Sequence, residues 1–427
     1  MDERVFDLCH FLNSSKSAYH AIASLKEKLE GEGYQYLPES ANWTLKSGGR
    51  YYLTRGGTSL IAFRIPEGWA EGFMMSAAHS DRPTFKWKEH GELTGKYTRL
   101  STEKYGGMLM APWLDRPLSL AGRVVVQTPN GLESRLVDID RDLLLIPNVA
   151  IHMNRKANDG YAYNPAQDML PLLGDGDAQG KLMPLLEKAA GGKIAGHDLT
   201  LYVRQKATVW GLEDEFISAA GLDDLQAVWC CTEGFLNAAE GSCVPVLCVF
   251  DSEEVGSSSL QGAASNLLES TLRRICEAMG WEMGRMLSQS FMVSADNAHA
   301  LHPNHPEYAD PNNAPVINAG VAIKFNANQR YTTDGMSAAI FRAVCEKAGV
   351  PVQTYCNRAD MAGGSTLGNI SLTHVSVPSV DIGLPQLAMH SCYETAGVRD
   401  SLYLADAMTV YYSSTLRSDC DGSCWIE

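Results

Sequence analysis

The sequence predicts an α/β protein: a mixed, mostly parallel sheet flanked by helices, into which a second, mainly β domain is inserted. Short apolar runs such as Val244–Phe250 have the length and composition of strands that are buried on both faces. These runs alternate with stretches of helical periodicity, as expected for a sheet with helices on both sides. Between residues 86 and 205 the pattern changes to short alternating strands. A chain of 427 residues is long enough for two domains.

The N-terminal part begins with a predicted helix. Ala18, Ile22, Leu25 and Leu29 recur at helical spacing, and two glycines, at positions 31 and 33, end the pattern. Three strand-like runs follow, separated by loops rich in glycine, proline and charge, at residues 50–54, 59–65 and 73–77.

Residues 86–205 are predicted to form the inserted domain. Alternating strands are expected at residues 120–127 and 199–203, and the stretch contains no cysteine. The larger domain is then discontinuous, comprising residues 1–85 and 206–427.

The α/β pattern resumes after the insertion. Helices are predicted at residues 223–238, 261–279 and 333–348, and strands at residues 244–250, 291–293 and 375–382. In such folds, ligands bind in the crevice at the carboxyl ends of the strands. We therefore expect the site where polar residues follow these strands.

Composition excludes several classes of function. A net charge of -15 argues against a nucleic-acid partner, because phosphate binding needs a basic surface. The N-terminal residues do not show the basic segment followed by an apolar run that marks a secretory signal, and no apolar stretch is long enough to span a bilayer. We therefore expect a cytoplasmic protein without a membrane partner. The eleven cysteines do not follow the regular spacing of a disulfide framework, which indicates that their thiols are reduced. Cys420 and Cys424 could bind a metal, but a pair without further ligands favours a structural role.

Five segments place acids and histidines where strands end or a helix begins. They lie at residues 76–83, 221–225, 250–256, 294–299 and 385–391. Two divalent cations about 3.5–4 Å apart need a shared anionic ligand, for which Asp223 is the candidate. Each cation needs further histidine and carboxylate ligands, and one carboxylate must remain free to take a proton from water.

The Glu253-Glu254 pair suits this division of roles. Neighbouring side chains at a strand end point to different sides, so one can bind a metal while the other faces the water. Asp81 stands two residues from His79 and could accept its ring N–H.

Each residue also has a structural alternative. His79 could be a structural histidine, the Glu253-Glu254 pair a solvated surface, Asp223 a helix cap and His390 a polar loop residue. Their co-occurrence beside short apolar strands favours a metal hydrolase.

The segments at residues 113–124, 146–152, 250–256, 294–302 and 385–391, taken together, resemble the aspartyl aminopeptidase family, the M18 metallopeptidases. The resemblance covers nearly the whole chain. It implies a phosphorylase/hydrolase-like metallopeptidase domain and an inserted dimerisation domain, with dimers that assemble into a tetrahedral dodecamer. It also implies two metal ions per subunit, zinc foremost, although His and carboxylate ligands also suit cobalt or manganese.

The resemblance also implies residue roles. His79 and Asp296 would hold one metal, Glu254 and His390 the other, and Asp223 would bridge them. Glu253 would be the general base, and Asp81 would orient His79. His302 and, from the inserted domain, His152 would be additional active-site histidines that contact substrate. Arg82 departs from the family by placing a cation after the His-x-Asp unit.

Lys324 and Tyr331 fall in a segment that resembles the family's substrate-pocket strand. An ammonium at position 324 could pair with a substrate carboxylate, and Tyr331 could donate a second hydrogen bond. Alternatively, Lys324 is the solvated polar member of an alternating strand. The resulting hypothesis is an aminopeptidase that removes N-terminal Asp, and also Glu, from peptides.

Two rival functions remain open. One is a metalloaminopeptidase of the same fold with neutral or broad specificity. The other is a non-catalytic scaffold that kept its metal cage, which the complete set of suitable residues disfavours.

Overall fold

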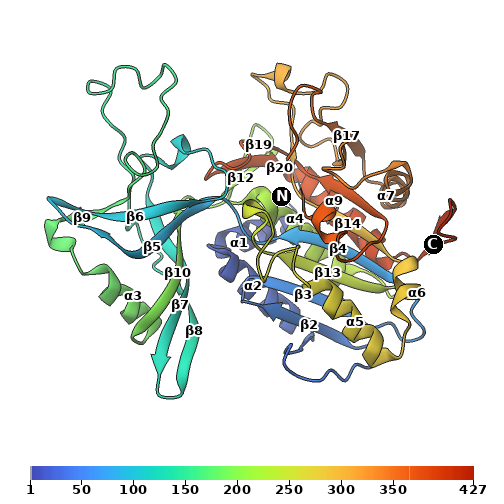
Figure 1. Cartoon of the computed structure of the whole chain (residues 1–427). Helices are drawn as coiled ribbons and strands as arrows, with labels where there is room; N and C mark the ends of the chain where they lie inside the picture. Colours follow the sequence, from blue (N-terminus) through green and yellow to red (C-terminus); the bar gives the residue numbers. More distant parts are fainter. Residues whose placement is uncertain (1, 365) are drawn as a thin grey trace.

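The computed structural model describes residues 2–364 and 366–427, and its centre is a nine-stranded mixed sheet (Figure 1). In spatial order the strands are β1 (Gln35–Tyr36), β2 (Arg50–Arg55), β3 (Ser59–Arg64), β13 (Val244–Phe250), β4 (Phe73–His79), β14 (Phe291–Ala295), β18 (Ser379–Gly383), β16 (Val321–Phe325) and β17 (Val352–Cys356). The four central strands, β13, β4, β14 and β18, are mutually parallel. The predicted α/β fold class is therefore confirmed.

Helices cover both faces of this sheet, which is why its central strands are apolar throughout. In β13, Leu247 and Val249 pack into one core, and Val246 and Cys248 pack into the other. The first core is completed by α1 (Glu3–Ser14), α2 (Ala18–Gly31), α4 (Leu222–Asn237), α7 (Gly335–Ala348) and α9 (Val398–Ser413). The second is completed by α5 (Leu267–Met279), α6 (Met283–Ser288) and α8 (Leu367–Ser371).

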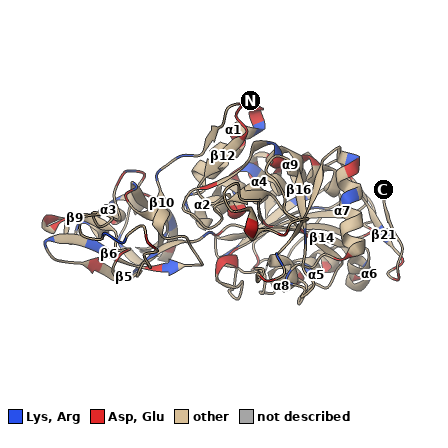
Figure 2. Cartoon of the chain, turned by 90° about the horizontal axis from the view of Figure 1, so that it is seen from above, with Lys and Arg blue, Asp and Glu red and all other residues tan. Residues whose placement is uncertain are grey.

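A second, antiparallel sheet is built from strands that all lie between Thr84 and Val203. Its order is β8 (Gly131–Asp138), β7 (Leu118–Thr128), β10 (Ile194–Val203), β5 (Thr84–Leu93), β6 (Tyr97–Tyr105) and β9 (Leu172–Asp175). Helix α3 (Leu182–Ala190) packs against this sheet in a core of its own. Figure 2 shows this sheet extending away from the helix-covered body, with charges of both signs on both parts. The division of the chain at residues 86–205 remains a prediction.

Smaller elements complete the chain. A five-stranded sheet contains β11 (Thr208–Trp210), β12 (Phe216–Ala219), β20 (Glu394–Gly397), β19 (Pro385–Leu387) and β15 (Ala298–His299). A hairpin joins β21 (Leu416–Ser418) and β22 (Cys424–Ile426). The short 3-10 helices of the described residues are η1 (Ala111–Trp113), η2 (Gly176–Ala178), η3 (Glu253–Val255) and η4 (Pro306–Tyr308). No helix among the described residues is long and apolar enough to cross a membrane.

Several predicted boundaries are wrong. The helix predicted at residues 261–279 begins only at Leu267, because the preceding loop folds tightly against Ser257. A Cβ on Gly262 would lie 2.0 Å from the Ser257 carbonyl oxygen. The strand predicted from residue 375 begins at Ser379. The helix predicted from residue 333 begins at Gly335, where the Asp334 side chain caps it.

Candidate active site

Three parallel neighbours of the large sheet carry candidate ligands at their carboxyl ends. His79 is the last residue of β4, Glu254 follows β13, and Asp296 follows β14. Because β13 and β14 both pair with β4, the strand ends bring these side chains into one crevice. This is the position at which open α/β sheets bind ligands.

Two further candidates reach the crevice from the five-stranded sheet and the helix that follows it. Asp223 lies in the first turn of α4, where its backbone is not helical (φ -82°, ψ 105°). His390 follows β19 and has a left-handed backbone, with φ 66°. The helix predicted at residues 223–238 is thus present as α4 (Leu222–Asn237), and the non-helical backbone of its first turn directs Asp223 into the crevice.

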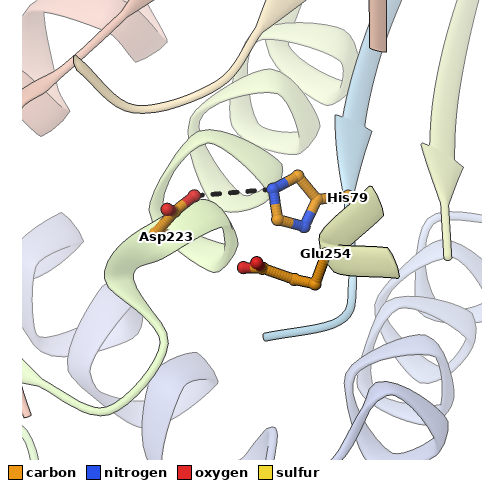
Figure 3. Close-up of side chains that lie close together, drawn as sticks. All are labelled: His79, Asp223 and Glu254. Atoms are coloured by element: carbon orange, nitrogen blue, oxygen red, sulfur yellow. Dashed lines mark ion pairs between the residues drawn. The ribbon is translucent and has the colours of Figure 1, made fainter. Parts of the chain in front are cut away.

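The distances between candidate ligand atoms fit shared metal ions. His79 Nε2 lies 3.4 Å from Asp223 Oδ1, and His390 Nε2 lies 3.4 Å from Asp223 Oδ2. His390 Nε2 is also 3.5 Å from Glu254 Oε2. Two atoms that each bind one tetrahedral zinc at about 2.0–2.2 Å are roughly 3.3–3.6 Å apart. Figure 3 shows His79, Asp223 and Glu254 converging from β4, α4 and η3.

Buried oxygen atoms test whether a cation fits here. Asp223 Oδ1 and Glu254 Oε1 are buried and have no hydrogen-bond partner among the residues that the structure describes. A buried, unpaired carboxylate oxygen is costly, and a coordinated cation removes that cost. The donor set therefore fits divalent metal ions.

Asp224 forms a second acidic cluster with Asp223 and Asp296, in which one oxygen of each residue lies within 4.8 Å of the others. Asp224 is fully buried, and its Oδ2 accepts a hydrogen bond from the backbone N–H of His79 at 3.1 Å. Burial raises the pKa of Asp224 well above its usual value. Asp224 therefore supports the main chain at His79.

Asp81 lies beside His79, but the hydrogen bond differs from the expected one. His79 Nδ1 is 3.1 Å from the Asp81 main-chain oxygen and 3.4 Å from its carboxylate Oδ1. The Asp81 carboxylate instead accepts from the backbone N–H groups of Glu253 and Glu254, each at 3.2 Å, and from the Tyr105 hydroxyl at 2.7 Å. Asp81 thus joins the histidine to the glutamate pair.

Glu253 does not lie at a strand end, as was expected, but on the 3-10 helix η3, three residues beyond β13. The tight turn of η3 therefore separates the two glutamate side chains, which was expected to result from the alternation of a strand. Glu253 lines a cavity of about 190 Å³ together with Asp223, Asp296, Lys324 and His390. Burial raises the pKa of Glu253 to about 7, which places its proton affinity near neutral pH.

Lys324 is buried in this cavity rather than solvated. Its residue is 3 % exposed, and the strand around it, β16, is buried on both faces. Lys324 Nζ lies 3.7 Å from Asp296 Oδ2 and 5.3 Å from the ring centre of Tyr331. Burial raises the pKa of Tyr331, so its hydroxyl remains a donor at neutral pH.

The two additional histidines are placed differently. His302 lines a neighbouring cavity of about 310 Å³, which shares His299, Tyr355 and Met389 with the smaller cavity. His152 is exposed in the inserted region and does not line either cavity. Within one described chain, the structure therefore brings His302 near the site but not His152.

Sequence reasoning missed Glu394 and Tyr105. Glu394 is 1 % exposed; one of its oxygens accepts from the backbone N–H of Asp223 at 3.0 Å, and the other accepts from that of His390 at 2.8 Å. Its signal was an acid four residues after a candidate ligand. Tyr105 carried no signal, because its partner Asp81 belongs to another part of the chain.

Two histidines and several carboxylates around a small cavity, at the carboxyl edge of a helix-covered sheet, define a metal-dependent hydrolase. The family model described as aminopeptidase I zinc metalloprotease (M18) matches residues 11–412. The chain belongs to this M18 family and is a metalloaminopeptidase.

Relatives and solved structures agree with this assignment. A probable M18 family aminopeptidase 2 from Clostridium novyi is 42% identical over 423 residues, covering 95% of this chain and 98% of the relative. Another from Pseudomonas paraeruginosa is 42% identical over 420 residues, covering 96% of this chain and 97% of the relative. A cryo-EM structure of the Ape4 and Nbr1 complex has a TM-score of 0.92 at 35% identity, covering 96% of this chain and 85% of that chain. An mApe1 dodecamer from S. cerevisiae has a TM-score of 0.85 at 25% identity, with 96% of each chain covered.

Proposed function

We propose that this metalloaminopeptidase uses two metal ions to remove an acidic residue, Asp or Glu, from the N-terminus of peptides. The observation that carries the two-metal part is the position of Asp223, whose two oxygens each face a different histidine at 3.4 Å. A carboxylate placed in this way can bridge two cations and offset their repulsion.

The assignment of ligands takes this arrangement together with the resemblance to the M18 family. His79 and Asp296 would hold one ion, His390 and Glu254 would hold the other, and Asp223 would be shared between them. Zinc suits this set, and cobalt or manganese would also be accepted.

Glu253 acts as the general base. Two bound cations would polarise the scissile carbonyl and lower the pKa of a water molecule. Glu253 lines the same cavity as Asp223 without being needed as a ligand, so its carboxylate can take the water's proton and deliver it to the leaving amine. The Asp81 carboxylate holds Glu253 in place through its backbone N–H.

Acidic specificity rests on Lys324. A buried ammonium in an otherwise acidic cavity can pair with the carboxylate of an N-terminal Asp or Glu, and the Tyr331 hydroxyl is available as a second donor. The alternative is neutral or broad specificity, with Lys324 serving only to balance the charge of Asp296, from which its Nζ lies 3.7 Å.

Assembly belongs to the same proposal. The inserted domain mediates dimerisation, and dimers build a tetrahedral dodecamer in which His152 would serve a neighbouring subunit's site together with His302. Support comes from the exposed position of His152 and from the similar mApe1 structure, which is described as a dodecamer.

The deciding experiment compares peptides that differ only at the N-terminal residue (Asp, Glu, Leu or Lys), using zinc-loaded, chelated and reloaded protein. We expect a strong preference for Asp or Glu that is lost on chelation and restored by metal. In Lys324→Met, which keeps the buried stem, kcat/KM for Asp should fall by about 30-fold or more relative to Leu, equivalent to ~2 kcal/mol.

Two outcomes would separate the parts of the proposal. Chelator-sensitive preference for Leu would keep the metal mechanism and refute the role of Lys324. An equal loss on Asp and Leu peptides in Lys324→Met would point to its charge balance with Asp296. Bound metal without hydrolysis of any peptide would favour the scaffold function.

A further inference from the structure

The chain leaving strand β6 of the second sheet crosses to the candidate metal site of the same chain. Residues 105–109, here called the clamp, follow the end of β6 at Tyr105. The clamp lies against Asp81, Glu254 and His390, three residues that come from separate parts of the body. A segment that leaves the inserted sheet therefore contacts three residues of the candidate site.

The first contact is the hydrogen bond that the Tyr105 hydroxyl donates to Asp81 Oδ2 at 2.7 Å. Asp81 also accepts the backbone N–H of Glu254, at 3.2 Å through the same oxygen. The hydroxyl thus fixes the carboxylate that fixes the main chain at Glu254. Loss of this hydroxyl would free one side of Asp81 to rotate.

The second contact is a close approach of backbone that only glycine allows. Gly106 has φ +74°, and a Cβ on it would lie 3.0 Å from Glu254 Cβ and 3.4 Å from Glu254 Oε2. Any larger residue would strain the backbone and push the Glu254 side chain.

The third contact is at His390. The backbone N–H of Leu109 donates to the His390 main-chain oxygen at 3.0 Å, and a Cβ on Gly107 would lie 3.9 Å from His390 Nδ1. Because His390 has φ 66°, an unfavourable backbone for a residue with a side chain, it needs such neighbours to keep its orientation.

We infer that the clamp sets the geometry of the metal position formed by Glu254 and His390, with Tyr105 as a positioning residue that acts through Asp81. This inference rests on the proposed two-metal function and goes beyond it. It makes the inserted domain part of the metal site of its own chain, in addition to any role in assembly. Substitutions in the clamp should lower the binding affinity for one of the two ions more than for the other.

The test is a cobalt titration of the intact protein, followed by visible absorption and by calorimetry. Tyr105→Phe removes one hydroxyl and keeps the ring, and Gly106→Ala adds the colliding methyl. Loss of such outer partners typically costs 10–100-fold in metal affinity, so we expect one of two cobalt ions to bind at least about tenfold more weakly in each variant. The absorption band of the weakened ion should also shift, which a general loss of stability would not produce.

Two matched controls lie in the same inserted region. Tyr202→Phe removes another tyrosine hydroxyl that donates, in a partly buried position, to an aspartate, Asp138, at 2.6 Å. Gly180→Ala adds a methyl at nearly the same backbone angle, φ +71°, where nothing lies within 4 Å. Both controls should bind two cobalt ions as the wild type does.

The outcomes separate this inference from the proposed function. A wild-type protein that binds two ions, with unchanged affinities and spectra in Tyr105→Phe, would overturn the clamp alone. A wild-type protein that binds no cobalt would overturn the two-metal proposal and the clamp with it. If circular dichroism shows that Gly106→Ala does not fold, the cobalt affinities and spectra of Tyr105→Phe alone decide whether the clamp acts on the metal position.

Discussion

Asp223 illustrates how much of the proposed chemistry depends on single atoms. Its backbone N–H is held by Glu394, while its two carboxylate oxygens face His79 and His390. Because Glu394 also accepts the N–H of His390, one buried carboxylate fixes the main chain of two candidate ligands relative to each other. A residue that does not line the site cavity can therefore determine where a metal ion would sit.

Glu253 carries the residue-scale prediction. Glu253→Gln keeps the size of the side chain but cannot take a proton, so we expect kcat to fall by about 10²–10⁴-fold. The zinc content and the free energy of unfolding should stay near the wild-type values, because Glu253 is not assigned as a ligand. Steady-state kinetics and metal analysis on the same sample measure both quantities.

The matched comparison for this variant is Glu254→Gln, an equal change at the neighbouring position. It should lose metal as well as activity, because Glu254 is an assigned ligand. Near-normal kcat in Glu253→Gln would show that another group accepts the proton.

At the scale of elements, helix α9 supports the strand that carries Lys324. Asp400, in its first turn, accepts hydrogen bonds from the backbone N–H groups of Asn318 at 2.6 Å and Gly320 at 2.9 Å, just before β16. Asp400 is fully buried. One carboxylate therefore ties the start of a helix to the start of a strand.

Asp400 predicts a pH dependence of stability. Burial raises its pKa in the folded protein to about 6, from 3.8 in the unfolded chain. The folded state thus binds the proton more tightly, and the stability that this contributes is fully present below pH 3.8 and lost as pH rises through about 6. In Asp400→Asn this fall in the free energy of unfolding between pH 4 and 6 should be smaller than in the wild type, as measured by urea denaturation.

Asp406→Asn provides the control on the same helix. Asp406 is exposed and pairs with Arg4 at the surface, where an ion pair contributes little. Its pH profile should follow that of the wild type. A profile of Asp400→Asn that also matches the wild type would contradict the assigned pKa.

At the scale of the whole molecule, the inserted region exposes large apolar side chains. They include Leu132, Leu136, Val149, Ile151 and Met153, of which Met153 is 82% exposed. Val149, Ile151 and Met153 lie on one short loop, and a cluster of exposed apolar side chains is typical of a surface that binds another protein. It is consistent with the proposed role of the inserted domain in assembly.

Met153→Glu tests that role. A charge placed in an apolar contact between subunits is costly to bury, so we expect a smaller assembly by size-exclusion chromatography with light scattering. Leu212→Glu, at a side chain that is 95% exposed outside the inserted region, should leave the mass unchanged. A wild-type monomer would refute the assembly proposal, and an unchanged assembly in Met153→Glu would place the interface elsewhere.

Local patterns predicted several of the helices and strands, but left others out and misplaced some of the ends. The apolar run of β13 and the helical spacing in α2 each reflect a periodicity that neighbouring residues share, so they could be recognised without the fold. The start of α5 could not, because the packing of Gly262 against Ser257 decides it. Helices α1, α3, α6, α8 and α9 were also missed.

The sequence by itself determined the fold class and the candidate ligands, because apolar periodicity and acids or histidines after strands are local features of the chain. The tertiary structure decided what lies between these segments. It buried Lys324, which alternation alone left as a possible surface residue, and it placed Glu253 on a 3-10 turn. It also brought in Glu394 and Tyr105: Glu394 accepts hydrogen bonds from two backbone N–H groups, and Tyr105 donates to the Asp81 carboxylate. Every residue except proline carries such an N–H, so no sequence pattern marks the one that a buried carboxylate will hold.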